Sequence, residues 1–265
     1  MTDTAHAHAL HFAILDHVAT ITIDNPVRMN ALNAAMWGAL PALVAKAEAD
    51  DGVRVILLRG AGVHAFSAGA DISEFATARA GDAVHAYDAL NHAAFDALTQ
   101  CRKPTIAMIH GFCLGGGLGL ALACDIRMAD EHGQFAIPAA KLGIGYNPRW
   151  ITPILRAVSP ATAKLMLFTG RRFSAEEALA MGLLAHVLPA KDLEAATHAL
   201  AAEIALNAPL SVTAAKATVD ELSGTNGTPD VAKLDRLVQA CFDSEDYAEG
   251  RKAFLDKRKP EFKGQ

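Results

Sequence analysis

Two short turns rich in small residues carry the pattern in this sequence that points most directly to chemistry. One is GFCLGGGLGL, residues 111–120, and the other is FSAGADI, residues 66–72. Glycine lets the backbone approach a ligand with bare N–H groups. A helix that begins in such a turn adds partial positive charge and unsatisfied donors. A glycine-rich turn that enters a helix therefore predicts a site for an anionic oxygen.

Other known functions of glycine-rich turns fit the turn at residues 111–120 less well. A dinucleotide fingerprint, G-x-G-x-x-G, fails because Leu120 stands at the third glycine position when counted from Gly115, and Leu122 does when counted from Gly117. A P-loop would end in Gly-Lys-Ser/Thr, which the turn lacks. Close packing of a helix on a strand also explains the glycines, and this turn alone leaves that interpretation open.

Each turn follows a continuous apolar run that is typical of a strand buried on both faces. These runs are residues 53–59 and 105–110. If the two strands are neighbours, their turns can direct two N–H groups at one oxygen. Such a pair is an oxyanion hole, in which removing one donor typically costs roughly 2.7–4 kcal/mol of transition-state stabilisation.

The remaining elements indicate an α/β protein with a helical C-terminal end. A hairpin is expected at 10–15 and 18–23, and the later strands alternate with helices at 34–50 and 83–101. From residue 149 onward helices predominate, at 149–157, 160–168, 175–181, 191–206, 209–222 and 230–255. We therefore expect an α/β core over 1–208 and a C-terminal helical region over 209–265.

Composition excludes some functions. The 265 residues are 52% hydrophobic with a formal net charge of −5, which argues against a general nucleic-acid binder. The cysteines form no zinc pattern, and the N-terminus lacks a signal peptide, so we expect a cytoplasmic protein. Five basic residues crowd the end of the chain, either as a solvated helix end or as a phosphate site: Lys252, Lys257, Arg258, Lys259 and Lys263.

Six segments, taken together and in order, resemble the crotonase (enoyl-CoA hydratase/isomerase) superfamily over nearly the whole chain. They are NPVRMNALN, FSAGADI, KPTIAMIHGFCLGGGLGLALACDIRMAD, FAIPAAKLGIGYNP, FTGRRFSAEEALAMGLLAHVLP and DSEDYAEGRKAFLDKRKPEF. The resemblance implies a spiral of ββα units with C-terminal helices that assemble trimers or pairs of trimers. It implies an acyl-CoA thioester substrate. Since no metal-ligand cluster is visible, we expect no cofactor beyond the CoA moiety. The net charge and the interrupted apolar stretch at 106–123 predict no nucleic-acid or membrane partner.

The resemblance also assigns residues by position. The two oxyanion N–H groups fall on Ala70 and Gly116. The adenine and ribose phosphate end of CoA would lie near Arg28, Ala31, Ala68, Asp71 and Ile72. From a neighbouring subunit, Phe254 and Lys257 match positions that close over the adenine, which makes the C-terminal basic run a candidate phosphate contact.

The hydratase branch has two acid/base positions, and this sequence carries no carboxylate at either of them. That branch carries one glutamate three residues after the oxyanion glycine and a second after the proline of F-x-x-P, and the two act on water as base and acid. Here the positions hold Gly119 and Ala139. A two-glutamate hydratase mechanism is therefore not expected.

Decarboxylation of a malonyl-type thioester needs an oxyanion hole but no base, because the leaving CO2 leaves its electrons in the enolate. The segments LGIGYNP and DSEDYAEGRKAFLDKRKPEF are similar to the methylmalonyl-CoA decarboxylase branch, whose active-site tyrosine matches Tyr146. Two positions depart from that branch, which has a histidine at Ala70 and a threonine at Ile137. Tyr146 is also explained by packing alone.

A third branch, the 4-chlorobenzoyl-CoA dehalogenase type, has a general-base histidine at the position of His92 and a nucleophilic aspartate at that of Asn147. The amide makes displacement an unexpected reaction here. His92 remains a candidate acid or base, since a free imidazole titrates near about pH 6.5, or it is an ordinary helix residue. Glu74 follows FSAGADI and either caps a short helix there or reaches the acyl pocket, and His110 is expected to bond a backbone group.

We therefore expect an acyl-CoA lyase that works through a thioester enolate, with decarboxylation as the preferred reaction. One alternative is an enoyl-CoA hydratase or isomerase with a relocated acid and base. The other is a non-catalytic acyl-CoA-binding homologue.

Overall fold

The strands form two sheets in the computed structural model, which describes residues 9–71, 83–224 and 228–265. The larger sheet has the order β1 (Ala9–Leu15), β2 (Val18–Asp24), β3 (Val55–Gly60), β5 (Thr105–Ile109), β7 (Ile126–Asp130) and β10 (His186–Leu188). The smaller has the order β4 (Ala65–Ser67), β6 (Phe112–Leu114), β8 (Gln134–Ala136) and β9 (Phe173–Ser174).

The expected N-terminal hairpin is confirmed. β1 and β2 pair antiparallel, and Leu15 lies opposite Val18. The two residues between them, Asp16 and His17, both have positive φ, as the tight turn of a twisted two-stranded hairpin requires. β2 then pairs parallel with β3, so the rest of the large sheet is parallel.

From β3 to β8, successive strands alternate between the two sheets, and this alternation produces the spiral. β3 leads to β4, β5 to β6 and β7 to β8, so each pair contributes one strand to each sheet. Helices α3 (Ala83–Thr99), α4 (Gly116–Ala123) and α5 (Pro148–Ala157) come after these pairs. The α/β spiral of ββα units expected from the sequence is confirmed.

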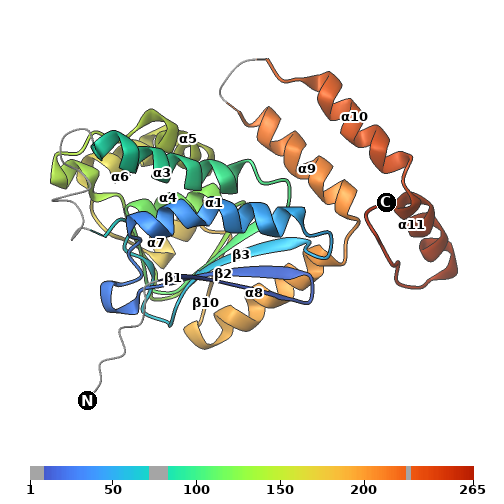
Figure 1. Ribbon diagram of the computed structural model, residues 1–265, viewed down its shortest axis with the longest axis horizontal. Coiled ribbons are helices and arrows are strands. Elements are labelled where there is room, and N and C mark those ends of the chain that lie inside the picture. The colour runs from blue at the N-terminus through green and yellow to red at the C-terminus, as the bar shows by residue number, and fades with distance from the viewer. Residues whose placement is uncertain (1–8, 72–82, 225–227) are drawn as a thin grey trace.

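Helices cover both faces of the large sheet, with α1 (Ala34–Ala49) on one side and α8 (Ala190–Ala205) on the other (Figure 1). The all-buried strand β3 explains why both are needed. Its residues Ile56 and Leu58 pack in the same cluster as Trp37 of α1. The alternating residues of the strand pack on the opposite face with Leu193 of α8.

The remaining helices lie at the edges and at the C-terminal end. They are η1 (Pro26–Arg28), η3 (Pro138–Leu142), α6 (Pro160–Thr169), α7 (Ala175–Ala180), α9 (Pro209–Leu222), α10 (Val231–Phe242) and α11 (Glu245–Asp256). Helices α9 to α11 project from the α/β body (Figure 1). Within the described part of the chain, no helix combines the length and apolar character needed to cross a membrane.

The single helix predicted for residues 230–255 is wrong, because the chain forms two helices there. α10 ends at Phe242, and α11 begins after Ser244. The Ser244 hydroxyl accepts a hydrogen bond from the Tyr247 N–H at 3.1 Å, and Glu245 and Asp246 occupy the first turn. A new N-cap with acidic residues behind it starts a second helix.

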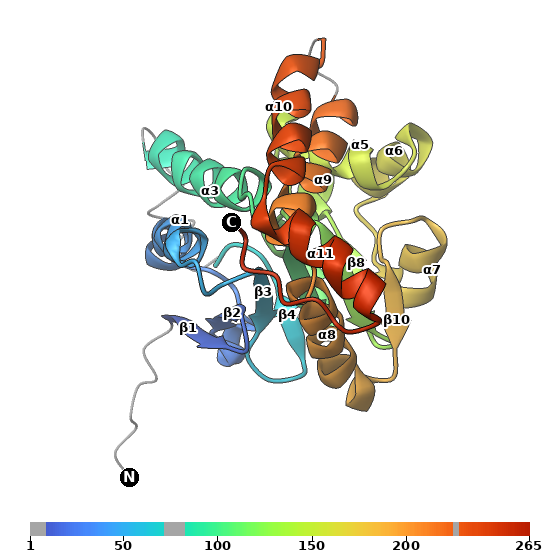
Figure 2. The same ribbon diagram turned by 90° about the vertical axis from the view of Figure 1, so that its right-hand side faces the viewer.

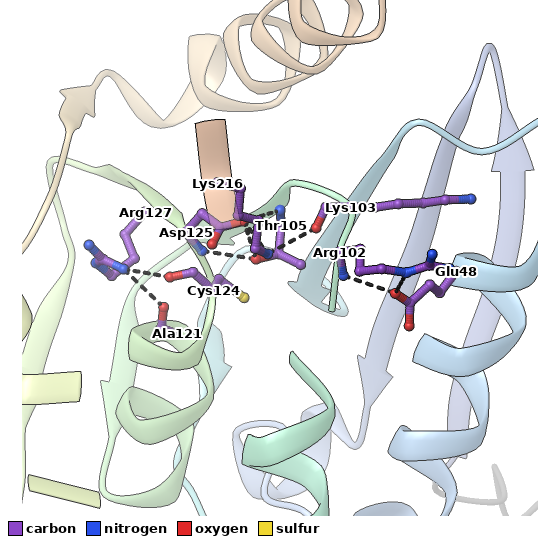
Figure 3. A network of polar contacts seen from close by, with 9 residues as sticks. All are labelled: Glu48, Arg102, Lys103, Thr105, Ala121, Cys124, Asp125, Arg127 and Lys216. Atoms are coloured by element: carbon purple, nitrogen blue, oxygen red, sulfur yellow. Dashed lines mark hydrogen bonds and ion pairs between the residues drawn. The ribbon is translucent and has the colours of Figure 1, made fainter. Parts of the chain in front are cut away.

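A buried cation fastens α9 to the large sheet (Figure 3). The Lys216 ammonium donates to Asp125 Oδ2 at 2.8 Å and to the Lys103 carbonyl at 3.0 Å, and its side chain is only 10% exposed. The same Asp125 oxygen accepts the Thr105 N–H at 2.7 Å. The pair therefore joins the C-terminal helices to the start of β5.

We predict that Lys216→Met lowers the free energy of unfolding by about 1–3 kcal/mol, because it leaves the partly buried Asp125 carboxylate without its cation. Guanidinium unfolding of the full chain measures the change. Lys191→Met is the matched control, since Lys191 is exposed at the start of α8. Equal losses in the two variants would contradict a fastening role for Lys216.

Candidate active site

The two small-residue turns meet in direct backbone contact. Gly69 has φ +93°, and a Cβ placed on it would lie 2.8 Å from the Gly116 nitrogen and 2.9 Å from the Leu114 carbonyl oxygen. A side chain at this position would push the turns apart. The parallel pairing of β4 with β6 brings the turns to the same place.

At this contact, Ala70 and Gly116 each hold an N–H group that makes no hydrogen bond to any described residue. Neighbouring N–H groups are used: Gly69 donates to Ser67 Oγ at 3.0 Å, and Gly115 donates to the Ala136 carbonyl at 2.8 Å. Gly116 is the first residue of α4, where backbone donors have no partner within the helix. Ala70 and Gly116 both line one cavity of about 120 Å³.

Most of that cavity, hereafter the oxyanion cavity, has apolar walls. The apolar side chains that line it come from three regions of the chain: Phe95, Ile137, Pro138, Leu142, Ile144 and Trp150. Asn91 and Tyr146 supply the polar side chains of the described lining. Burial raises the pKa of the Tyr146 hydroxyl well above its ordinary value, so the hydroxyl remains protonated at neutral pH.

Asn91 is a cavity residue that sequence reasoning missed. Its side-chain amide donates to the Tyr87 carbonyl at 2.7 Å, which fixes its orientation within α3. The alanine-rich sequence of this helix contains no motif that separates Asn91 from its neighbour His92. Only the packing of α3 against the two turns reveals which of them faces the cavity.

His92 lies in a different cavity from Ala70, Gly116 and Tyr146. This second cavity, about 100 Å³ in volume, is lined by His92, Asp96 and Gly119 among others. The His92 ring packs on Trp150 with centroids 5.3 Å apart, and its Nε2 is buried without a hydrogen-bond partner among the described residues. The structure therefore does not bring His92 to the two N–H groups.

The two positions that hold glutamates in hydratases differ in their surroundings. Ala139 lines the oxyanion cavity. Gly119 lines the second cavity, and a Cβ on it would lie 2.9 Å from two carbons of the Phe95 ring. Phe95 thus occupies the space into which a residue-119 side chain would extend.

Asn147, the counterpart of a nucleophilic aspartate in dehalogenases, caps a helix. Its side-chain oxygen accepts the Arg149 N–H at 3.0 Å at the start of α5. The amide therefore has a local structural role. Trp150, in the first turn of the same helix, forms part of the wall of both cavities.

The loop of residues 25–32 brings the predicted CoA-binding residues together. The Ala68 N–H donates to the Met29 carbonyl at 2.8 Å, and the Arg28 guanidinium pairs with Asp71 at 2.7 Å. Asp71 is 9% exposed and Arg28 46%, so the cation lies at the surface. Ala31 lies in the same loop, whereas Ile72 and Glu74 lie outside the described residues.

Two buried asparagines, also missed by sequence reasoning, hold this loop in place. The Asn30 amide donates to the carbonyls of Ala65 and Ala61, at 2.7 and 2.9 Å. Asn25 donates from its amide to the Ala31 carbonyl at 2.8 Å. The segment NPVRMNALN offered a signal, because asparagine tolerates the positive φ of 53° found at Asn30.

The expectation that His110 bonds a backbone group is wrong. Its Nδ1 lies 2.7 Å from the Asp130 carboxylate, and both side chains are buried. The contact joins the ends of β5 and β7, just before the chain enters β6 and β8. The contact therefore holds together the two points at which the chain leaves the larger sheet for β6 and β8 of the smaller sheet.

Phe254 and Lys257 lie far from the other predicted CoA residues of the same chain. Phe254 is 84% exposed on α11, and Lys257 ends that helix. Figure 1 shows α11 at the far end of the C-terminal helices, away from α3 and α5, and Figure 2 shows it in front of the sheets. Within one subunit these residues do not reach the cavity.

Comparisons with known proteins identify the family of this chain. The family model described as enoyl-CoA hydratase/isomerase matches residues 14–265. This chain belongs to that family. The superfamily membership expected from the sequence is thereby confirmed.

Individual relatives match over nearly their whole length. The short-chain-enoyl-CoA hydratase of Clostridium acetobutylicum is 33% identical over 244 residues, which cover 92% of this chain and 93% of the relative. The carnitinyl-CoA dehydratase of Proteus mirabilis is 34% identical over 262 residues, with 97% and 99% covered. The crystal structure of an enoyl-CoA hydratase/carnithine racemase from Magnetospirillum magneticum has a TM-score of 0.92 at 38% identity, covering 97% of this chain and 96% of that one.

We predict that Gly119→Ala lowers the free energy of unfolding by about 1–3 kcal/mol, because its Cβ overpacks the Phe95 ring. That ring cannot easily yield, since Trp37 and Trp150 hold it at centroid distances of 5.6 and 5.9 Å. In a Phe95→Leu background the same change should cost less. Thermal or guanidinium unfolding of the wild type, the two single variants and the double variant measures this double-mutant cycle.

Gly145→Ala is the matched control, because a Cβ at Gly145 meets no atom of the described residues within 4 Å. Its effect on stability should be small. If Gly119→Ala costs the same with and without the Phe95 ring, the two residues do not compete for one space.

Proposed function

We propose that this chain is an acyl-CoA lyase that stabilises a thioester enolate, and that its reaction is the decarboxylation of a malonyl-type CoA ester. One observation carries the proposal. The unused N–H groups of Ala70 and Gly116 face a cavity whose described lining contains no acidic or basic side chain. Such a lining can bind an oxyanion, and its described residues include no carboxylate pair with which to add or remove water.

Decarboxylation fits these groups because it needs no base in its first step. The bond between the α-carbon and the carboxylate breaks, CO2 leaves, and the electron pair enters the thioester enolate. Negative charge then gathers on the thioester oxygen, where the two N–H groups stabilise it. The apolar walls also favour neutral CO2 over a buried carboxylate, since an unpaired charge is costly to bury.

Tyr146 is the hydroxyl in the described lining of the cavity. In the proposed reaction it donates a hydrogen bond to the substrate carboxylate and then to the enolate. Its raised pKa keeps this donor protonated throughout the neutral range. We assign no role to His92 in this reaction, because it lines the second cavity and not the cavity of the two N–H groups.

A second candidate, hydration or dehydration of an enoyl-CoA with a relocated acid and base, is favoured by the names of the relatives, a short-chain-enoyl-CoA hydratase and a carnitinyl-CoA dehydratase. It requires a proton-transferring pair in place of the residues at 119 and 139. A non-catalytic acyl-CoA-binding protein is the third candidate.

The CoA moiety completes the proposal. Its adenine and ribose phosphate end would lie along the loop 25–32 and the FSAGADI turn, near Arg28, Ala31, Ala68, Asp71 and Ile72. Phe254 and Lys257 of a neighbouring subunit would close over the adenine, which requires a homotrimer or a dimer of trimers. In this proposal residues 209–265 form the assembling region and 1–208 the catalytic core.

We predict that the purified full chain releases CO2 from methylmalonyl-CoA or malonyl-CoA and hydrates crotonyl-CoA slowly or not at all. Labelled CO2 release and loss of enoyl absorbance measure the two reactions. Rapid hydration of crotonyl-CoA would instead establish the second candidate. Tight binding of all three esters without turnover would establish the third.

Gly116→Pro should lower kcat/KM by about 10²–10³-fold, because proline removes the N–H proposed to bind the oxyanion. Gly116→Ala is the matched control. It introduces the same Cβ, 3.1 Å from the Trp37 ring, but keeps the N–H. A similar loss in both variants would show that crowding, and not the missing donor, reduces activity.

A further inference from the structure

Two aromatic side chains separate the oxyanion cavity from the second cavity behind it. Among the described lining residues, Phe95 and Trp150 are the two that line both cavities. Phe95 comes from α3 and Trp150 from α5, and their ring centroids are 5.9 Å apart at an interplanar angle of 75°. We call this pair of rings the aromatic wall.

The aromatic wall is held on both sides by further rings. Phe95 packs edge-on against Trp37 of the core, and it is only 8% exposed. Trp150 packs against Tyr146 on one side, with centroids 5.4 Å apart, and against His92 on the other. Gly119 leaves no free space beside Phe95. Neither ring can therefore turn aside without displacing a packed neighbour.

The space behind the aromatic wall continues toward the C-terminal helices. The second cavity shares Thr99, Pro153 and Arg156 with a third cavity of about 530 Å³. That third cavity is lined in part by α9 residues, including Lys216. Neighbouring cavities thus share lining residues, and the residues shared by the first and the second are the two rings of the aromatic wall.

We propose that the aromatic wall sets the length of the acyl group, so that this protein takes short-chain CoA thioesters and excludes longer ones. This inference rests on the proposed function for the placement of the thioester at Ala70 and Gly116. An acyl chain that extends from these N–H groups meets Phe95 and Trp150 at the far side of the oxyanion cavity.

The physical reason is that a longer chain has no room in the cavity for its extra carbons while the wall stands. Each methylene that moves from water into an apolar cavity improves affinity about fourfold. With both rings in place, however, additional methylenes must displace packed side chains, and this overpacking weakens binding. Removing one ring would join the first two cavities and let those methylenes be buried.

Isothermal titration calorimetry with butyryl-CoA, octanoyl-CoA and free CoA on the full chain tests the inference. Both esters are saturated and serve as ligands without turnover. Wild-type protein should bind butyryl-CoA at least about tenfold more tightly than octanoyl-CoA. Phe95→Ala should bind octanoyl-CoA at least as tightly as butyryl-CoA, and the affinity for free CoA should not change.

Leu98→Ala is the matched control, because it truncates a fully buried side chain one turn further along α3 that lines none of the three cavities. It should keep the wild-type order of affinities. If Phe95→Ala does not fold, Phe95→Leu and Trp150→Leu carry the test, with a smaller shift toward octanoyl-CoA.

Tighter binding of octanoyl-CoA by the wild type would overturn the inference. An unchanged order of affinities in the folded Phe95 and Trp150 variants would also overturn it, while leaving the proposed function intact. If the wild type binds no CoA thioester at all, the proposed function fails and the inference fails with it.

Discussion

The contact between the backbones of Gly69 and Gly116 is the constraint on which the site depends. It exists because β4 and β6 run side by side and because Gly69 adopts a φ of +93° with no side chain in the way. Both turns continue from this contact into the residues whose N–H groups remain unused. A widening of the contact would separate Ala70 from Gly116, and the oxyanion cavity would lose its shape.

The same contact links the site to the loop of residues 25–32. Leu32 donates to the Gly69 carbonyl at 2.8 Å and accepts from the Asp71 N–H at 2.9 Å. The paired Arg28 and Asp71 side chains therefore keep a fixed position relative to the two N–H groups. In the proposed function, CoA would lie along this loop and its thioester at the turns, so both parts of the ligand would contact segments that backbone hydrogen bonds hold together.

Much of this structure could be predicted from sequence because its signals are local. The hairpin of β1 and β2, the buried strands β3 and β5, and α1 with its Asn33 cap all follow from short patterns. The two-helix end of the chain was missed because the prediction of one helix overlooks Ser244, with Glu245 and Asp246 behind it, as the N-cap of a second helix. The His110–Asp130 contact was missed because it joins residues 20 positions apart on different strands.

For the site, the sequence identified the turns and the absent glutamates but not the separation of cavities. That separation depends on how α3 and α5 pack, and no local pattern specifies that Phe95 and Trp150 will meet. Position 119 is filled by an aromatic neighbour, whereas position 139 lines the oxyanion cavity. The two positions are thus unequal. A lineage that gained carboxylates at both would have to repack Phe95 for residue 119, whereas a side chain at residue 139 would extend the wall of a cavity that already exists.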